Sequence, residues 1–294
     1  MPETVQRLKV LKTYKLFIGG KFPRTESGRY LRAHDVKTGE QLANYCHASR
    51  KDLRNAVTAA RSAFPGWAAK SAYLRGQIIY RIAEMIESRS HAIADEITSS
   101  SATSTPDALA EVAATVDRLV HFAGWSDKYQ QVFSSVNPVA SPHFNFSTLE
   151  PTGVVGIVCP DEPCLLALAS LTAEAVLSGN CTVALASEKY PLPAVAFAEA
   201  LATSDVPAGV INILTGKRDE LTPTFASHMD INAIVDASGD PALATTLQGG
   251  VADNLKRVSI RDLTPAGWTT AAARDPYRIL DTVEVKTAWH PAGL

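Results

Sequence analysis

The second half of the chain constrains the fold most, because short uninterrupted apolar runs alternate there with amphipathic segments. A continuous apolar strand has no solvent-facing side, so helices must cover both faces of the sheet that it joins. Strands that alternate with helices are typical of parallel order. The sequence therefore predicts an α/β fold with a doubly wound parallel sheet. The expected strands are residues 154–159, 182–185, 210–214, 231–235 and 258–260, and the helices between them are residues 165–177, 192–203, 220–227 and 241–254.

The first part of the chain is predicted to be mostly helical. Ser49 and Asp52 fit the start of a capping box, and apolar residues follow at helical spacing as far as the sequence Pro65-Gly66-Trp67, where this helix should end. The same spacing continues over residues 73–97 and 106–129, and the polar run 98–106 between them predicts a loop. Ahead of these helices, the pair Gly19-Gly20 in residues 15–22 predicts a tight turn between two short strands.

Two strand signatures lie outside the strand–helix alternation. Residues 141–149 alternate apolar and polar side chains, and residues 282–289 do so strictly before His290-Pro291. Such alternation is typical of a strand with one exposed face.

The composition is that of an ordinary globular protein, with 46% hydrophobic and 20% charged residues and a formal net charge of -2. Residues 1–61 carry 13 Lys and Arg against 5 Asp and Glu, but these are interleaved with apolar residues. We therefore expect a solvated basic face rather than a nucleic-acid site. No apolar stretch approaches the ~20 residues of a membrane span, and the N-terminus has no apolar leader. The four scattered cysteines, without a C-x-x-C pair, fit a reducing cytoplasm.

The common catalytic and cofactor motifs are missing from the sequence. There is no glycine-rich dinucleotide or phosphate loop, and no G-x-S-x-G elbow. No two histidines have the spacing of metal ligands, so no metal site is predicted. Each of the seven histidines is interpreted as a surface or packing residue.

Residues 150–160, EPTGVVGIVCP, resemble the entry to the cofactor domain of the aldehyde dehydrogenase superfamily. Further segments resemble the same family and occur in its order between about residues 16 and 261. The resemblance implies a cofactor domain with an N-terminal helical part, binding of NAD or NADP, and assembly into oligomers. The other matching segments are residues 17–22, 38–40, 48–67, 122–125, 177–180, 183–188 and 207–216.

The resemblance also marks candidate cofactor contacts at the strand ends. The family's Lys-Pro-Ser-Glu reads Leu-Ala-Ser-Glu here, so a ribose acceptor survives while the cation is lost. The family's phosphate turn, Phe-Thr-Gly-Ser-Thr, reads Asp-Ala-Ser-Gly-Asp over residues 236–240. Two carboxylates beside the place for a pyrophosphate argue against anion binding there. The candidate residues are Pro160, Ser187, Glu188, Gly216, Ser238 and Gly239.

The catalytic positions depart further from the family. Glu162 takes the place of an Asn that holds the oxyanion, and a carboxylate would repel that developing charge. Arg261 takes the place of the Glu general base and cannot accept a proton from water at neutral pH. Cys164 is the candidate substitute nucleophile, with Glu162 as its base. A structural role for this thiol is favoured, because the matched pattern places no base near it.

The family has its whole catalytic domain after the last strand, whereas here a short segment, residues 263–281, leads to a surviving arm. Residues 283–289 look like the family's C-terminal arm, which pairs with the 141–149 region and reaches the sheet edge of another subunit's catalytic domain. A strand added to a foreign sheet edge is a specific binding device. The alternative is that the tail folds back as an edge strand of its own chain. The residues predicted to bind a partner are Phe144, Phe146, Val283, Val285, Thr287 and Trp289.

Five regions follow from these patterns. The predicted function is a non-catalytic structural or regulatory subunit that associates with a full-length aldehyde dehydrogenase or with its own copies in the cytoplasm. One alternative is a degenerate NAD(P)-dependent oxidoreductase, and another is a nucleotide-binding sensor without chemistry. The regions are an N-terminal hairpin and helical part (1–137), an oligomerisation strand (138–150), a Rossmann-like part (151–262), a linker in place of the catalytic domain (263–281) and a C-terminal oligomerisation arm (282–294).

Overall fold

The structure, a computed structural model, describes residues 10–292, so the first nine residues of the basic N-terminal region lie outside it. Five strands form a central sheet in the order β10-β9-β6-β7-β8, and all its neighbours are parallel. This arrangement confirms the predicted α/β fold with a parallel sheet. The strands are β6 (Val154–Val158), β7 (Cys181–Leu185), β8 (Ile211–Leu214), β9 (Ala233–Asp236) and β10 (Arg257–Ile260).

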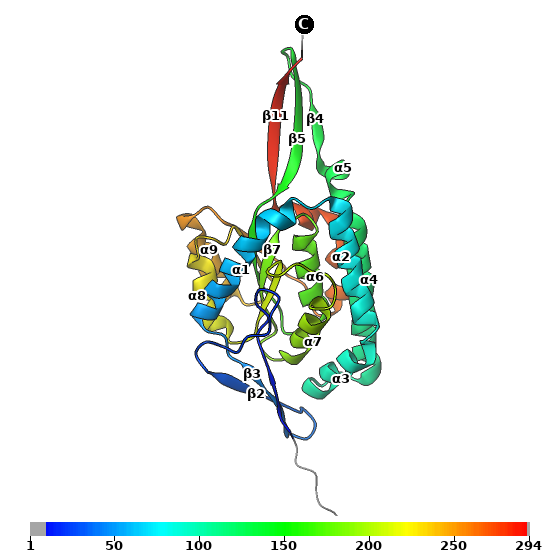
Figure 1. Ribbon diagram of the computed structural model, residues 1–294, viewed down its shortest axis with the longest axis vertical. Helices are drawn as coiled ribbons and strands as arrows, with labels where there is room; N and C mark the ends of the chain where they lie inside the picture. Colours follow the sequence, from blue (N-terminus) through cyan, green and yellow to red (C-terminus); the bar gives the residue numbers. More distant parts are fainter. Residues whose placement is uncertain (1–9, 293–294) are drawn as a thin grey trace, which may run out of the picture.

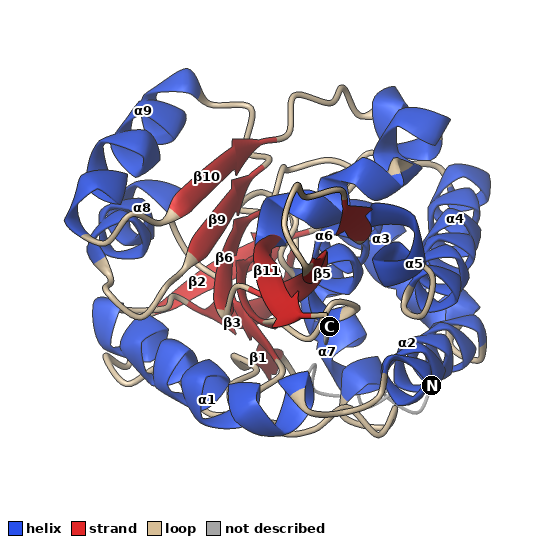
Figure 2. Ribbon diagram, turned by 90° about the horizontal axis from the view of Figure 1, so that it is seen from above, coloured by secondary structure: helices blue, strands red, loops and turns tan. Residues whose placement is uncertain are grey.

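Helices cover both faces of this sheet, as uninterrupted apolar strands require (Figures 1 and 2). Every residue of β6 and β7 is buried. One face packs against α6 (Leu166–Val176) and α7 (Leu192–Leu201). These two helices are backed by α2 (Ala72–Glu87), α3 (Ser90–Ser100) and α4 (Thr105–Trp125). The other face packs against α1 (Arg50–Ala68), α8 (Arg218–Ser227) and α9 (Pro241–Gly249).

The order of the strands creates a reversal point beside β6. The chain runs outward from β6 through β7 to β8, and then returns to place β9 on the other side of β6. In open parallel sheets, ligands bind outside the carboxyl ends of the strands at such a reversal. The topology alone therefore directs attention to the loops that follow β6 and β9.

The first helix begins as predicted but ends later. In α1 (Arg50–Ala68), Ser49 and Asp52 form the capping box. The expected end at Pro65 is wrong, because the helix continues through it. Trp67 is 1% exposed and donates from Nε1 to the Val176 carbonyl at 2.9 Å, so tertiary packing holds the last turn in place.

Two other helix predictions also need correction. Residues 73–97 are two helices, α2 (Ala72–Glu87) and α3 (Ser90–Ser100), because the backbone turns at Arg89 with φ -116° and ψ 13°. The polar run is a loop only over residues 101–104. Ser100 and Ser101 donate to the carbonyls of Glu96 and Ile97 at 2.6 and 2.7 Å, which satisfies the last turn of α3. The helix expected over residues 106–129 is α4 (Thr105–Trp125), followed by α5 (Tyr129–Phe133).

The N-terminal region adds a small sheet in the order β1-β3-β2. The two strands expected around Gly19 and Gly20 are reduced to a single bridge between Ile18 and Lys21. Both glycines have positive φ, 59° and 73°, as a tight turn of this type requires. The strands of the small sheet are β1 (Lys12–Tyr14), β2 (Tyr30–His34) and β3 (Gln41–Cys46).

A second small sheet, here called the arm, projects from one end of the molecule (Figure 1). It consists of β4 (Ser135–Asn137), β5 (His143–Pro151) and β11 (Val283–Pro291), in the order β11-β5-β4. Strand β11 lies antiparallel to β5 along its whole length, from the pair Val283 and Pro151 to the pair Pro291 and His143. Both predicted strands are present, and β11 runs two residues further than expected, to Pro291.

A buried side chain takes part in attaching the root of the arm to the core, beside the contacts of Arg257 with the Val283 carbonyl and with Glu284. Asn180 is fully buried, accepts from the Gly153 backbone N–H at 2.8 Å, and donates to the Thr282 carbonyl at 2.7 Å. The backbone N–H of Thr152 donates to the same carbonyl at 3.2 Å. The starts of β6 and β11 are therefore fixed to the same turn.

The segment from residue 263 to 281 folds against the core in three 3₁₀ turns, within Ala266–Thr269, Ala271–Arg274 and Pro276–Thr282. It buries Trp268, and the buried Arg118 guanidinium of α4 donates to the carbonyls of Trp268 and Ala273 at 2.6 and 2.9 Å. Buried Trp268, Ala273 and Ile279 attach this otherwise largely exposed segment to the domain.

Candidate functional site

A cleft of about 430 Å³ lies where the topology places a ligand site, outside the ends of the parallel strands. The loops after β6, β7, β8 and β9 all contribute to it. Four carboxylates and three cationic side chains line this cleft, so it is crowded with charge. The lining residues are Asp161, Glu188, Lys189, Lys217, Arg218, Asp219, Asp240 and Leu243.

The centre of the cleft is a bidentate ion pair between Asp161, after β6, and Arg218, at the start of α8. Arg218 donates from Nη2 to Oδ1 of Asp161 at 2.7 Å and from Nη1 to Oδ2 at 3.2 Å. Its Nη2 also donates to the Cys159 carbonyl at 2.8 Å. Only 11% of the Arg218 side chain and 23% of the Asp161 side chain are exposed. Burial alone would raise the pKa of Asp161, but the hydrogen bonds and charge of Arg218 hold it below its usual value.

A second ion pair, between Glu188 and Lys217, lies in the cleft beside the first. Glu188 accepts from Lys217 Nζ at 2.6 Å and from the backbone N–H of Arg218 at 2.9 Å. The hydrogen bond to Glu188 raises the pKa of Lys217. Glu188 is the residue that resemblance assigned to the ribose, and here its two carboxylate oxygens already bind the start of α8.

The phosphate-turn region forms the opposite wall. Asp240 is the N-cap of α9, and its Oδ1 accepts from the backbone N–H groups of Ala242 and Leu243 at 2.8 and 3.4 Å. Asp236 accepts from the Ser238 N–H at 2.9 Å. The helix start that would receive a phosphate is therefore already occupied by a carboxylate of the chain itself.

The other candidate cofactor residues face the protein more than the cleft. Pro160 is buried. Ser187 donates to the Asp161 carbonyl at 3.1 Å and accepts from the Tyr190 N–H at 2.9 Å. A Cβ on Gly216 would lie 3.2 Å from both His47 Cδ2 and the Ala48 nitrogen, so this glycine permits close packing against β3. Gly239 is exposed, with φ 71°.

Arg261, in the position of the family's general base, is held in a buried network. Its guanidinium pairs with Glu174 of α6 and with Asp281, each at 2.5 Å, and only 5% of its side chain is exposed. Both carboxylates raise the pKa of Arg261 against the opposing effect of burial. This guanidinium lines a hollow of about 290 Å³ between the ends of β9 and β10, together with Asp236, Asp240 and Asp262.

Cys164 lies inside the protein at the start of α6, 4% exposed. Burial raises its pKa well above the usual value of a thiol, and the charge of Glu111 raises it further. Glu111 accepts from the backbone N–H groups of Leu165 and Leu166 at 2.8 and 3.2 Å, so it occupies the helix start. The charge of Glu162 also raises the pKa of this thiol, so the neighbouring groups favour the neutral thiol over the nucleophilic thiolate.

Sequence reasoning missed the two ion pairs, although a signal for them existed. Asp161 follows one strand by three residues, and Lys217 and Arg218 follow another by three or four. The carboxyl ends of parallel strands meet at one edge of a sheet, so opposite charges at these positions were candidates to pair.

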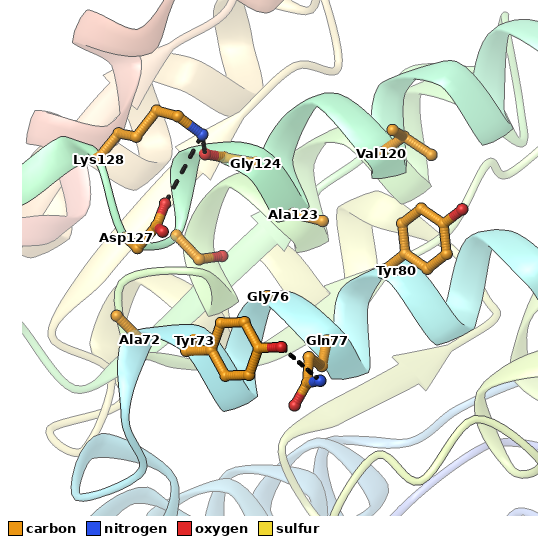
Figure 3. Close-up of a pocket in the computed structure, with 11 residues that line it drawn as sticks. Ala72, Tyr73, Gly76, Gln77, Tyr80, Val120, Ala123, Gly124, Asp127 and Lys128 are labelled. Atoms are coloured by element: carbon orange, nitrogen blue, oxygen red, sulfur yellow. Dashed lines mark hydrogen bonds and ion pairs between the residues drawn. The ribbon is translucent and has the colours of Figure 1, made fainter.

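A separate hollow of about 330 Å³ lies between α2 and α4 (Figure 3). Tyr73 and Tyr80 border it, 68% and 50% exposed, and Gln77 donates to the Tyr73 hydroxyl at 3.1 Å. Its only charged lining residues, Asp127 and Lys128, pair with each other at 3.7 Å. The lining holds no histidine or cysteine.

The residues predicted to bind a partner divide between the two faces of the arm. Phe144 and Phe146 lie on one face, with ring centroids 5.5 Å apart, and line a hollow of about 340 Å³. Val285, Thr287 and Trp289 lie on the other face. Phe144, Val285 and Trp289 are 52%, 64% and 59% exposed. The sixth candidate, Val283, is 2% exposed at the root of the arm.

Three further features bear on the kind of protein this is. Among residues 10–292, no helix is long and apolar enough to cross a membrane. The same part of the chain holds no group of three or more His, Cys, Asp or Glu side chains that could bind a metal ion. All four cysteines are free and buried.

A doubly wound parallel sheet with a charged cleft at its reversal point defines the class of dinucleotide-type α/β domains. The chain itself belongs to the aldehyde dehydrogenase family, whose sequence profile matches residues 23–261. It is 31% identical over 261 residues to cytosolic 10-formyltetrahydrofolate dehydrogenase of Xenopus laevis, covering 87% of this chain and 29% of that protein. It is 29% identical over 265 residues to aldehyde dehydrogenase, cytosolic 1, of Elephantulus edwardii, covering 88% and 52%.

Solved structures agree with this assignment. The NAD⁺ complex of aldehyde dehydrogenase from Bacillus cereus superposes with a TM-score of 0.80 at 26% identity, over 85% of this chain and 50% of that one. An aldehyde dehydrogenase from Burkholderia cenocepacia gives a TM-score of 0.80 at 30% identity, over 84% and 50%. The chain thus spans about half the length of these structures, and the NAD⁺ complex indicates dinucleotide use in the family.

Proposed function

We propose that this chain is a non-catalytic structural or regulatory subunit that assembles through its arm with a full-length aldehyde dehydrogenase. The observation that carries the proposal is the arm itself. Its outer strand β11 pairs with β5 on one side only, and apolar side chains on both faces of the arm are exposed. An edge strand with uncovered apolar residues is suited to join a foreign sheet.

The pairing of β11 with β5 bears on the fold-back alternative. The tail does pair within its own chain, along nine residue pairs. That pairing uses one side of β11 and stiffens the arm as a unit. A stiff, preformed strand loses less conformational entropy on binding than a loose tail would, so the intrachain pairing supports the role of β11 as a docking edge.

The catalytic positions support a role without chemistry. Arg261 stands where resemblance places the general base, and its charge is committed to Glu174 and Asp281. The substitute nucleophile Cys164 is buried as a thiol of raised pKa. The proposed compartment is the cytoplasm, which suits four buried free thiols.

The test is to mix the purified chain with a full-length aldehyde dehydrogenase from the same cell and to measure molar mass by size-exclusion chromatography with light scattering. We expect a stable mixed species. Val285→Lys should abolish it, because a charge would be buried in the new sheet contact. Val36→Lys is the matched control, since Val36 is 52% exposed in the turn between β2 and β3, at the opposite end of the molecule (Figure 1).

Two results would contradict the proposal. Oligomers of the chain alone, with no mixed species, would favour the homo-oligomer and reject the full-length partner. Reduction of NAD⁺ by the isolated chain with any aldehyde would favour the degenerate oxidoreductase, with Cys164 as nucleophile.

A further inference from the structure

The cleft at the strand ends does not fit the dinucleotide that the family implies. A dinucleotide brings a pyrophosphate with two negative charges, which needs free backbone N–H groups or cations. Here the N–H groups at the start of α9 are capped by Asp240, and the Arg218 guanidinium is held by Asp161. The lining carries four carboxylates against three cations, so the charge that a phosphate would meet is already negative.

The place for the ribose is also taken. A ribose acceptor must offer a free carboxylate oxygen to the sugar hydroxyls. Both oxygens of Glu188 are engaged, one by Lys217 Nζ at 2.6 Å and the other by the backbone N–H of Arg218 at 2.9 Å. Releasing one oxygen would leave a partly buried cation or N–H group without its partner, which is costly.

These contacts connect three elements that a bound dinucleotide would otherwise bridge. Asp161 extends the end of β6 and accepts from the backbone N–H groups of Glu188 and Lys189, after β7, at 3.0 and 3.2 Å. Through Arg218 it also holds the start of α8. One carboxylate thus ties together the ends of three neighbouring strands.

We propose that the cleft is an internal ion-pair lock that takes the place of the dinucleotide, so that this chain folds and functions without binding NAD or NADP. In the lock, Asp161 and Glu188 neutralise Arg218 and Lys217, and Asp240 supplies the negative charge at the start of α9. The proposed ion-pair lock lies in the cleft and does not depend on assembly through the arm.

The first experiment is isothermal titration calorimetry of the full chain with NAD⁺, NADH and NADP⁺, beside a full-length aldehyde dehydrogenase as positive control. We expect saturable heat from the full-length enzyme and none from this chain up to millimolar dinucleotide. Saturable one-to-one binding to this chain, with a Kd below about 1 mM, would overturn the proposal.

The second experiment measures whether the ion pairs stabilise the fold. Arg218→Met should lower Tm by about 5 °C without nucleotide, because it leaves the partly buried carboxylate of Asp161 without its partner. Lys189→Met is the control from the same cleft, because its side chain is exposed. It should shift Tm by no more than about 1 °C. Equal, small shifts in both variants would show that Arg218 locks nothing and would reject the proposal.

Discussion

The cleft and the arm differ in how their side chains are satisfied. In the cleft, charged groups that could hold a ligand are paired with each other, as in Asp161 with Arg218. On the arm, large apolar side chains such as Val285 and Trp289 stay more than half exposed. The charged groups of the cleft are paired with the chain's own side chains, whereas the apolar side chains of the arm stay uncovered.

This contrast concerns two properties: the exposure of apolar side chains on the arm and the pairing of charged groups in the cleft. Apolar side chains on a projecting sheet gain free energy only when a second surface covers them. Charged groups in a partly buried cleft are costly unless they are paired, so a chain that binds no charged ligand must pair them internally. The arm keeps exposed apolar side chains, and the charged groups of the cleft stabilise one another.

The largest expected difference between regions is in amide hydrogen exchange. Amides of β6 and β7 lie in the buried core and should exchange only on global unfolding. Amides at the exposed end of β11, near Trp289, should exchange on the order of a thousandfold faster, because local opening of the arm exposes little buried surface. Exchange monitored by mass spectrometry measures this ratio. Equal protection in the isolated chain would show that the exposed end of β11 opens no more readily than the core.

The next effect tests the buried network behind the cleft. Arg261→Met should lower the free energy of unfolding by about 3–5 kcal/mol, because Glu174 would stay buried without its partner. Urea denaturation measures the change. Lys51→Met is the control, since its pair with Glu26 is 61% and 44% exposed and should contribute at most about 1 kcal/mol. Similar losses in the two variants would show that Glu174 is neutral in the fold.

A smaller effect follows from the lowered pKa of Asp161. A carboxylate with a lowered folded pKa stabilises the protein above its unfolded pKa, here 3.8, and this stabilisation is lost as pH falls through the folded pKa. Asp161→Asn should therefore cost about 2 kcal/mol at pH 7. The variant should also lose less stability than the wild type between about pH 5 and pH 2. Parallel pH curves for the two proteins would mean that Arg218 does not hold the ionised form.

The smallest effect is expected on the arm. Thr287 and Ser147 share a hydrogen bond of 2.8 Å between exposed hydroxyls of β11 and β5. Thr287→Val should change the free energy of unfolding by about 0.5 kcal/mol or less, because water replaces this bond. A loss above about 2 kcal/mol in urea denaturation would show that the arm contributes to the stability of the core.

The sheet could be predicted from sequence because its signal is local. Each apolar run, such as the one that forms β6, is long enough for a strand and too short for a helix. The signal for the start of α1 was equally local, since Ser49 and Asp52 satisfy each other's backbone N–H groups. The break at Arg89 could not be predicted, because apolar spacing continues from Ile86 to Ile93 on both sides of it.

The site was less predictable for a related reason. The residues that pair in the cleft are far apart along the chain: Asp161 and Arg218 are separated by 57 in sequence number. Resemblance singled out Glu188, which lines the cleft, but it could not show that its carboxylate is already engaged. Pairings of this kind depend on the three-dimensional approach of loops, which composition and spacing do not encode.

The attachment of the arm has a consequence for the symmetry of any assembly. Because Asn180 ties the start of β11 to the turn before β6, the arm leaves the core in one direction. In an assembly built through the arm, the rotation between neighbouring subunits would then depend on how the arm is fixed to the core as well as on the contact residues. If that rotation closes, the assembly is a ring of fixed size, and if it does not, the chains form an open filament. In such an assembly, the side chains at the root of the arm would thus influence the number of subunits.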